Sequence, residues 1–126
     1  MPVRQEIQEN GHLIAYRISD PWQIDDLIKF FPEDRVYRST ARHKVHTLVD
    51  VQTMRYVPPG AIRTRFAPAL IHPNSGEFVV VGITPRVHQV LRIILRLARF
   101  ERVQVFQHEE AARSFLRGVI ASETAL

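Results

Sequence analysis

The stretch Glu77-Phe-Val-Val-Val-Gly-Ile83 (EFVVVGI) decides the fold class, because it is the clearest strand in the chain. No polar side chain occurs between Phe78 and Ile83. A strand with one face in water alternates apolar and polar residues, whereas a strand buried on both faces is apolar throughout. The run therefore predicts a central strand of a parallel sheet that is covered on both sides.

The chain that follows this strand predicts a helix, a strand and a second helix. Thr84 and Pro85 are typical of a helix start, and the apolar pattern continues to Phe100. Residues 102–106 (RVQVF) alternate and predict another strand. Residues 108–119 then carry apolar positions at helical spacing, with two glutamates in the first turn, where they suit the helix dipole.

The N-terminal part predicts a hairpin and one further strand. Residues 3–8 and 12–18 alternate, and Asn10-Gly11 between them is a strong hairpin signal, because both residues tolerate a positive φ. Residues 45–51 (VHTLVDV) are rich in β-branched side chains and predict a buried strand.

Two helical segments are expected before and after residues 45–51. Asp20-Pro21 is typical of a helix start, and a core stripe runs to Phe31 before Pro32 ends or kinks the helix. Residues 33–44 fit either a second short helix or a loop. A helix starting at Pro59 is expected to be kinked or stopped by Pro68. Its predicted apolar face consists of Ile62, Phe66, Ala69 and Leu70.

The predicted element order is β-β-α-β-α-β-α-β-α. It indicates an α/β fold with a four- to five-stranded, mostly parallel sheet, an N-terminal β-hairpin and helices packed on the sheet. We expect a single domain over residues 1–120 and a frayed C-terminal tail over residues 121–126.

Composition indicates an ordinary globular protein of 126 residues, with 45% hydrophobic and 24% charged residues. The chain has no cysteine, which excludes disulfides and thiolate chemistry. Its first residues lack the apolar segment of a signal peptide, and residues 87–100 are too short and too charged to span a bilayer. We therefore expect a cytoplasmic protein without a membrane span.

The net charge of +4 leaves two interpretations open. It fits an anionic partner, such as nucleic acid or a lipid surface. However, the 17 basic residues include only two lysines, Lys29 and Lys44, and the arginines are spread from Arg4 to Arg117 without a block of like charges. Such heavy use of arginine also fits a proteome-wide bias, and nucleic acid is the less favoured partner.

Three local patterns, together with the element order, resemble the STAS family of anti-sigma-factor antagonists and their transporter-linked relatives. These patterns are the strand that ends in Asp50-Val51, the VVVG strand at residues 79–82, and the ending VQVFQHEEAARSFL at residues 103–116. The resemblance covers almost the whole chain. It implies a protein-interaction or regulatory module without catalysis.

The family's phosphorylation motif is absent. Antagonist members carry Asp-Ser-Ser-Gly at the start of the second helix, where this chain has Val57-Pro58-Pro59-Gly60. The serine that a kinase would phosphorylate is missing, so the phosphoswitch is not carried over. The resemblance still implies a partner surface on residues 55–66, for which the candidates are Arg55, Gly60, Ile62, Arg63 and Phe66.

The predicted helix over residues 85–100 is apolar over about twice the arc that one sheet surface needs. The extra arc fits either cover by neighbouring helices or self-association, as in a homodimer, through Ile93, Leu97 and Phe100. Its narrow polar stripe is a solvated face or, alternatively, a site for phosphates of a nucleic acid or an anionic surface. The stripe consists of His88, Arg92, Arg96 and Arg99.

No catalytic motif occurs in the sequence, and we expect neither enzymatic activity nor a cofactor. The six histidines include no pair at metal-binding spacing, so no metal site is predicted. A pocket for an anion or a small ligand is the remaining alternative. Its candidates are Asp50, Thr84 and Arg86, because open α/β sheets bind ligands at the carboxyl ends of their strands. The competing interpretation of Asp50 is that it orders the following loop.

Overall fold

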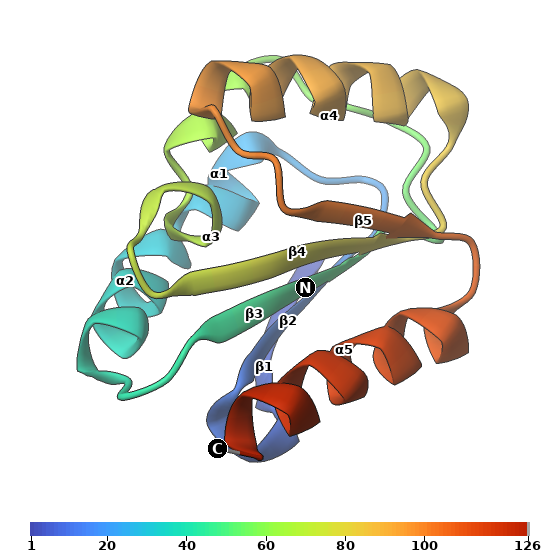
Figure 1. Cartoon of the computed structure of the whole chain (residues 1–126). Coiled ribbons are helices and arrows are strands. Elements are labelled where there is room, and N and C mark those ends of the chain that lie inside the picture. The colour runs from blue at the N-terminus through green and yellow to red at the C-terminus, as the bar shows by residue number, and fades with distance from the viewer. Residues whose placement is uncertain (126) are drawn as a thin grey trace.

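A single five-stranded sheet forms the centre of the molecule in the computed structural model, which describes residues 1–125 (Figure 1). The strands lie in the sequence order β1-β2-β3-β4-β5. β1 and β2 are antiparallel and the other neighbours are parallel. The strands are β1 (Val3–Gln8), β2 (Leu13–Ile18), β3 (Val45–Asp50), β4 (Ser75–Val81) and β5 (Val103–Phe106). This confirms the predicted α/β fold with an N-terminal hairpin.

The helices form two unequal layers, one on each face of the sheet (Figure 1). The parallel strands follow one another across the sheet, so crossovers of uniform hand place every connecting helix on the same face. That layer contains α1 (Ile24–Ile28), α2 (Phe31–Thr40), the 3₁₀ helix η2 (Ala61–Phe66), α3 (Pro68–Ile71) and α4 (Pro85–Ala98). The last helix, α5 (Glu109–Thr124), packs alone on the other face, against β3, β4 and β5.

The apolar run in β4 serves both layers, as its pattern predicts. Val79 and Val81 pack in the core beneath α5, whereas Phe78 and Val80 contact the cores on the opposite face. Successive side chains of a strand point to opposite sides, so a strand covered twice has no position for a polar residue.

The hairpin between β1 and β2 turns through the short 3₁₀ helix η1 (Glu9–Gly11). All three of its residues have a positive φ, from 51° at Glu9 to 91° at Gly11. The phenol of Tyr37 in α2 donates a hydrogen bond of 2.8 Å to the Gly11 carbonyl, which ties the turn to the helix layer.

The first helical region differs from the expected single helix that ends at Pro32. Asp20 does not cap it, because its carboxylate accepts the backbone N–H of Arg55 instead. The helix begins after Gln23, which forms a reciprocal capping box with Asp26. Pro32 lies in the first turn of a second helix, α2, where a missing N–H costs nothing. Within the stretch 33–44, which fits either a helix or a loop, residues 33–40 are thus helical and residues 41–44 form a loop.

The expected long helix from Pro59 is replaced by two short pieces. Neither Pro58 nor Pro59 can donate a hydrogen bond, and Gly60 adopts a left-handed conformation with φ 85°, so helical structure starts only at Ala61. Pro68 stops η2 and opens α3, as its position predicts. Ala69 and Leu70 are buried as expected, but Ile62 and Phe66 of the predicted apolar face are exposed.

The ends of the last two helices also differ from the prediction. α4 stops at Ala98 because its C-cap, Arg99, takes a left-handed conformation that turns the chain back. Phe100 is consequently buried, edge-on to Phe78, and is not available for self-association. α5 continues to Thr124, beyond the residue at which a frayed tail was expected to begin; Leu126 lies outside the described residues.

Candidate functional site

A cavity of about 130 Å³ lies between the sheet and the larger helix layer. The sheet contributes side chains that point to this face of β2, β3 and β4, namely Tyr16, Ile18, Thr47, Val49, Phe78 and Val80. The helix layer and its loops contribute the opposite wall, which includes Trp22, Ile24, Leu27, Ala61, Val87 and Leu91. Nearly all of these side chains are apolar, so the cavity suits an apolar occupant.

Short side chains on the crossover between β3 and β4 leave this space open. The crossover uses η2 and the four-residue α3 instead of a long α-helix. Four of its residues that line the cavity are small, namely Ala61, Thr64, Ala67 and Ala69, and the larger Leu70 of α3 lines it as well. A larger apolar residue at one of these four positions would extend into the cavity.

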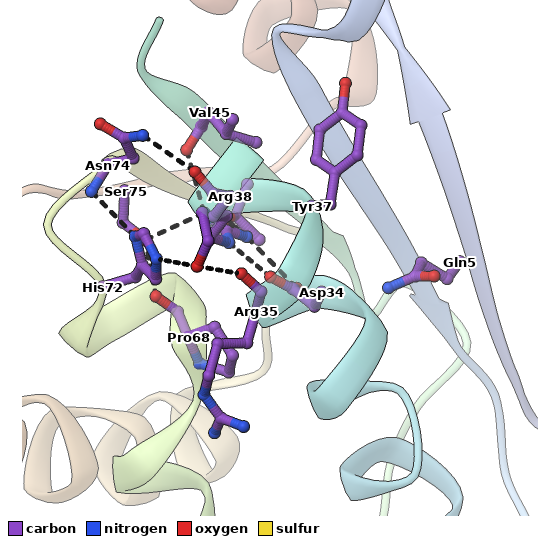
Figure 2. A network of polar contacts seen from close by, with 12 residues as sticks. Gln5, Asp34, Arg35, Tyr37, Arg38, Val45, Pro68, His72, Asn74 and Ser75 are labelled. Atoms are coloured by element: carbon purple, nitrogen blue, oxygen red, sulfur yellow. Dashed lines mark hydrogen bonds and ion pairs between the residues drawn. The ribbon is translucent and has the colours of Figure 1, made fainter. Parts of the chain in front are cut away.

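A buried polar network, drawn in part in Figure 2, contributes Tyr16, Asp34 and Thr47 to the cavity wall. Asp34 of α2 lines the cavity and accepts the phenol of Tyr16, with 2.6 Å between the two oxygen atoms. The Tyr16 oxygen in turn accepts the side-chain amide of Gln5 at 2.8 Å. Asp34 also pairs with the guanidinium of Arg38, one turn further along the helix.

Arg38 holds this network together from inside the protein. Its Nη1 donates to the carbonyl of Val45 and to Oγ of Ser75, both at 3.0 Å, and its Nη2 donates to Oγ1 of Thr47 at 2.9 Å. The bonds to Asp34 complete the five donors of the guanidinium. A buried cation with every donor satisfied is a structural element, and it is not available to a ligand.

The phenol of Tyr16 stays neutral over the physiological pH range. Burial raises its pKa well above the ordinary value of 10.0, and the carboxylate of Asp34 beside it raises the pKa further. The phenol therefore serves as a hydrogen-bond donor to Asp34 at the wall of the cavity.

Within this helix layer, η2 and α4 together expose four large apolar residues. They are Ile62 and Phe66 on η2 and Ile93 and Leu97 on α4, between 49% and 57% exposed, and we name them the η2–α4 surface. The two elements pack side by side. The predicted partner segment and the predicted self-association face therefore lie next to each other.

The other residues of the predicted partner segment have local roles. Arg55 is exposed and donates through Nη1 to the carbonyls of Gln52 and Met54. Gly60 supplies the left-handed turn before η2. Arg63 forms an exposed ion pair of 3.2 Å with Asp25, a residue of α1.

The three candidates for an anion or ligand pocket are not brought together on one side of the sheet. Asp50 faces the α5 side, where its carboxylate accepts Nε of Arg17 at 3.1 Å and the backbone N–H of Gln52 at 3.0 Å. It thus orders the loop after β3. Thr84 caps α4 in the opposite layer and accepts the N–H of Val87, and Arg86 is exposed on that helix.

Three histidines gather near the amino ends of the parallel strands. The rings of His12 and His43 stack with centroids 3.9 Å apart, and Nε2 of His46 lies 2.8 Å from a carboxylate oxygen of Glu123. His12 Nδ1 is buried without a hydrogen-bond partner, and burial and the neighbouring His43 lower the pKa of this ring. Within residues 1–125, no three His, Asp or Glu side chains are placed to hold a metal ion.

Sequence reasoning missed the cavity and the polar network in its wall. The one available signal was the four-residue spacing of Asp34 and Arg38, in the stretch that fits either a helix or a loop. In a helix, such a spacing places both side chains on one face. Tyr16 and Thr47 looked like ordinary strand residues.

No protein-family model, curated protein or solved structure matches this chain. The resemblance to the STAS family thus rests on the sequence patterns alone. Within residues 1–125, every helix falls short of the length and apolar character needed to cross a bilayer.

Proposed function

We propose that this chain is a non-catalytic binding domain that holds a small apolar molecule between its sheet and its larger helix layer. The observation that carries the proposal is the cavity of about 130 Å³, with an almost wholly apolar lining. Natural cores leave few spaces larger than a water molecule, so a space of this size is unusual in a small domain.

The size of the cavity limits the ligand. Engineered apolar cavities of about 150 Å³ stay free of water and take up benzene or xenon. A single aromatic ring or a short alkyl chain therefore matches this cavity. Water is a poor occupant, because the apolar wall offers few of the polar partners that a buried water molecule needs.

The chemistry of the lining favours binding over catalysis. Its ionisable residues are Tyr16 and Asp34. Asp34 is engaged by Arg38 and Tyr16, and the raised pKa of Tyr16 keeps the phenol neutral. Neither group is free to exchange a proton with a ligand. The resemblance to STAS domains, which act by binding, supports the same conclusion.

The test uses benzene as the probe and two adjacent residues of β4 as the variants. Val80 lines the cavity, whereas Val79 packs beneath α5. We expect benzene at tenfold its dissociation constant to stabilise the parent by about 1.4 kcal/mol and to raise the melting temperature by a few degrees. Val80→Phe fills the cavity and should abolish this response, and Val79→Phe should keep it.

A second readout follows from Trp22, which lines the cavity and is the single tryptophan of the chain. Bromobenzene should quench its fluorescence in the parent and not in Val80→Phe. If Val79→Phe fails to fold, Val79→Ile takes its place as the control. A parent that responds to neither probe, or a Val80→Phe variant that responds like the parent, would show that the cavity does not bind such molecules.

A further inference from the structure

The two elements that expose the η2–α4 surface also form part of the cavity wall. Ala61 and Thr64 of η2 and Val90 of α4 line the cavity. Ile93 and Leu97 follow Val90 by three and seven residues, so they lie on the same flank of α4 as that residue. The exposed apolar side chains are thus separated from the cavity only by the thickness of η2 and α4.

The charge on these two elements has a single sign. Neither Ala61–Phe66 nor Pro85–Ala98 contains an aspartate or a glutamate. Arg63 and Arg65 lie on η2, and the guanidinium of Arg65 is 4.2 Å from the centre of the Phe66 ring. The exposed arginines on α4 and at its C-cap are Arg86, Arg92, Arg96 and Arg99. Of all six, only Arg63 is in an ion pair within residues 1–125.

We propose that the η2–α4 surface docks on an anionic lipid bilayer, with its apolar side chains in the interface and its arginines on the phospholipid headgroups. Large apolar residues combined with arginines are typical of amphipathic helices that lie in the plane of a membrane interface. Anionic headgroups supply the charge that complements the arginines. No helix in the described part of the chain is suited to cross the bilayer, so contact is at its surface.

A second copy of the chain is a poorer occupant of this surface. A twofold dimer brings the same patch of both copies together, so the arginines of η2 and α4 would face their own counterparts. Like charges placed opposite each other in an interface are strongly unfavourable. The bilayer also suits the cavity, because it is the phase into which an apolar molecule partitions. In that respect the inference rests on the proposed function.

The test is sedimentation with vesicles of phosphatidylcholine, with and without phosphatidylglycerol. The parent should bind the anionic vesicles, should bind the neutral ones much less, and should be released by salt. Ile93→Ser combined with Leu97→Ser should weaken binding roughly tenfold, because the apolar contact with the interface is lost. Arg92→Gln and Arg96→Gln should each weaken it roughly fivefold.

Matched controls come from α2, outside this surface. Val36 is an exposed apolar residue and Arg35 an exposed arginine, and Val36→Ser and Arg35→Gln should leave vesicle binding unchanged. Equal binding to both kinds of vesicle, no binding to either, or an equal loss in these controls would overturn the proposal. A parent that is dimeric in light scattering, with Leu97→Glu monomeric, would assign the surface to a second copy and would overturn it as well.

The two proposals fail separately. Variants of the η2–α4 surface leave the cavity lining intact, so they should keep the response of the melting temperature to benzene. Val80→Phe should keep vesicle binding. Loss of vesicle binding by the parent, with its benzene response intact, would overturn docking alone. A missing benzene response with normal vesicle binding would overturn the cavity function alone.

Discussion

Arg38 and Asp34 lie one turn apart in α2 and form an ion pair that is closed off from water, with 0% and 1% of their side chains exposed. The pair joins three parts of the fold, because Arg38 also binds the start of β3 and the start of β4. Taking two charges out of water is costly, and this geometry offsets the cost by satisfying every donor of the guanidinium.

Removing one member of this pair is expected to destabilise the fold strongly. Arg38→Met leaves the carboxylate of Asp34 buried without its cation, and such a loss costs about 3–5 kcal/mol, a large part of the stability of a small domain. Urea unfolding followed by circular dichroism measures the change. Arg35→Met on the exposed side of the same helix should stay within about 0.5 kcal/mol of the parent. Similar unfolding midpoints for the two variants would contradict a structural role for the pair.

The raised pKa of Tyr16 predicts a loss of stability at alkaline pH. Above its ordinary pKa of 10.0, the phenol of the unfolded chain releases its proton, whereas the folded protein retains it. The stabilising contribution is therefore complete below pH 10.0 and decreases as the pH rises, by up to about 1.4 kcal/mol per pH unit. Urea unfolding between pH 8 and 11 tests this slope.

Tyr16→Phe isolates that contribution. At pH 8 the variant should be less stable by about 1–3 kcal/mol, because Asp34 loses a buried hydrogen bond. Its alkaline slope should be shallower than that of the parent. Absorbance at 295 nm gives an independent reading: one of the three tyrosines should ionise only on unfolding. Three tyrosines that titrate together in the folded protein would contradict the assignment.

The strands could be predicted from the sequence because their signal is local. Val79 and Val81 point to one side of the sheet and Phe78 and Val80 to the other, and a strand with two covered faces has an apolar residue at every position. The end of α4 could not be predicted in the same way. The left-handed C-cap of α4 is Arg99, whereas a glycine is usual at such a position. Without a glycine to mark the end of the helix, the apolar pattern predicted a helix as far as Phe100.

The candidate site is less accessible to sequence reasoning, because its parts come from distant segments. Glu109 and Arg113 have the same spacing as Asp34 and Arg38 and also form an ion pair, yet that pair is partly exposed on α5. Spacing alone therefore does not distinguish a buried network from a surface pair. The cavity brings alanines of one crossover together with strand residues that lie far back in the chain, such as Ala69 with Tyr16. No local pattern records such an arrangement.

The lowered pKa of His12 predicts a loss of stability in mild acid. Burial and the neighbouring His43 lower the pKa below the ordinary 6.5, although the carboxylate of Glu123 opposes them. Below pH 6.5 the unfolded chain gains a proton at this ring before the folded protein does. The contribution of the neutral His12 ring to the stability of the fold is thus complete above pH 6.5. It decreases as the pH falls toward the pKa of the ring in the folded protein.

Unfolding in urea at pH 7.5 and pH 5 measures this effect. His12→Gln should lose less stability between the two pH values than the parent does. His88→Gln, on the part-exposed side of α4, should behave like the parent. An identical loss in His12→Gln and the parent would assign the acid sensitivity to other groups.

Alanine substitutions at two glycines, Gly82 in the turn after β4 and Gly118 in α5, should have opposite effects on stability. Gly82 has φ 75°, its N–H donates to the Phe106 carbonyl at 2.8 Å, and a Cβ added there would lie 2.9 Å from the Cα of Gln52. Gly82→Ala should therefore destabilise the fold by more than about 1 kcal/mol. Gly118 lies in α5 with open space around it, and Gly118→Ala should stabilise the fold by about 0.5–1 kcal/mol. Thermal unfolding of the two variants against the parent decides the matter: a Gly82→Ala protein as stable as Gly118→Ala would mean that the loop after β3 does not hold Gln52 against this turn.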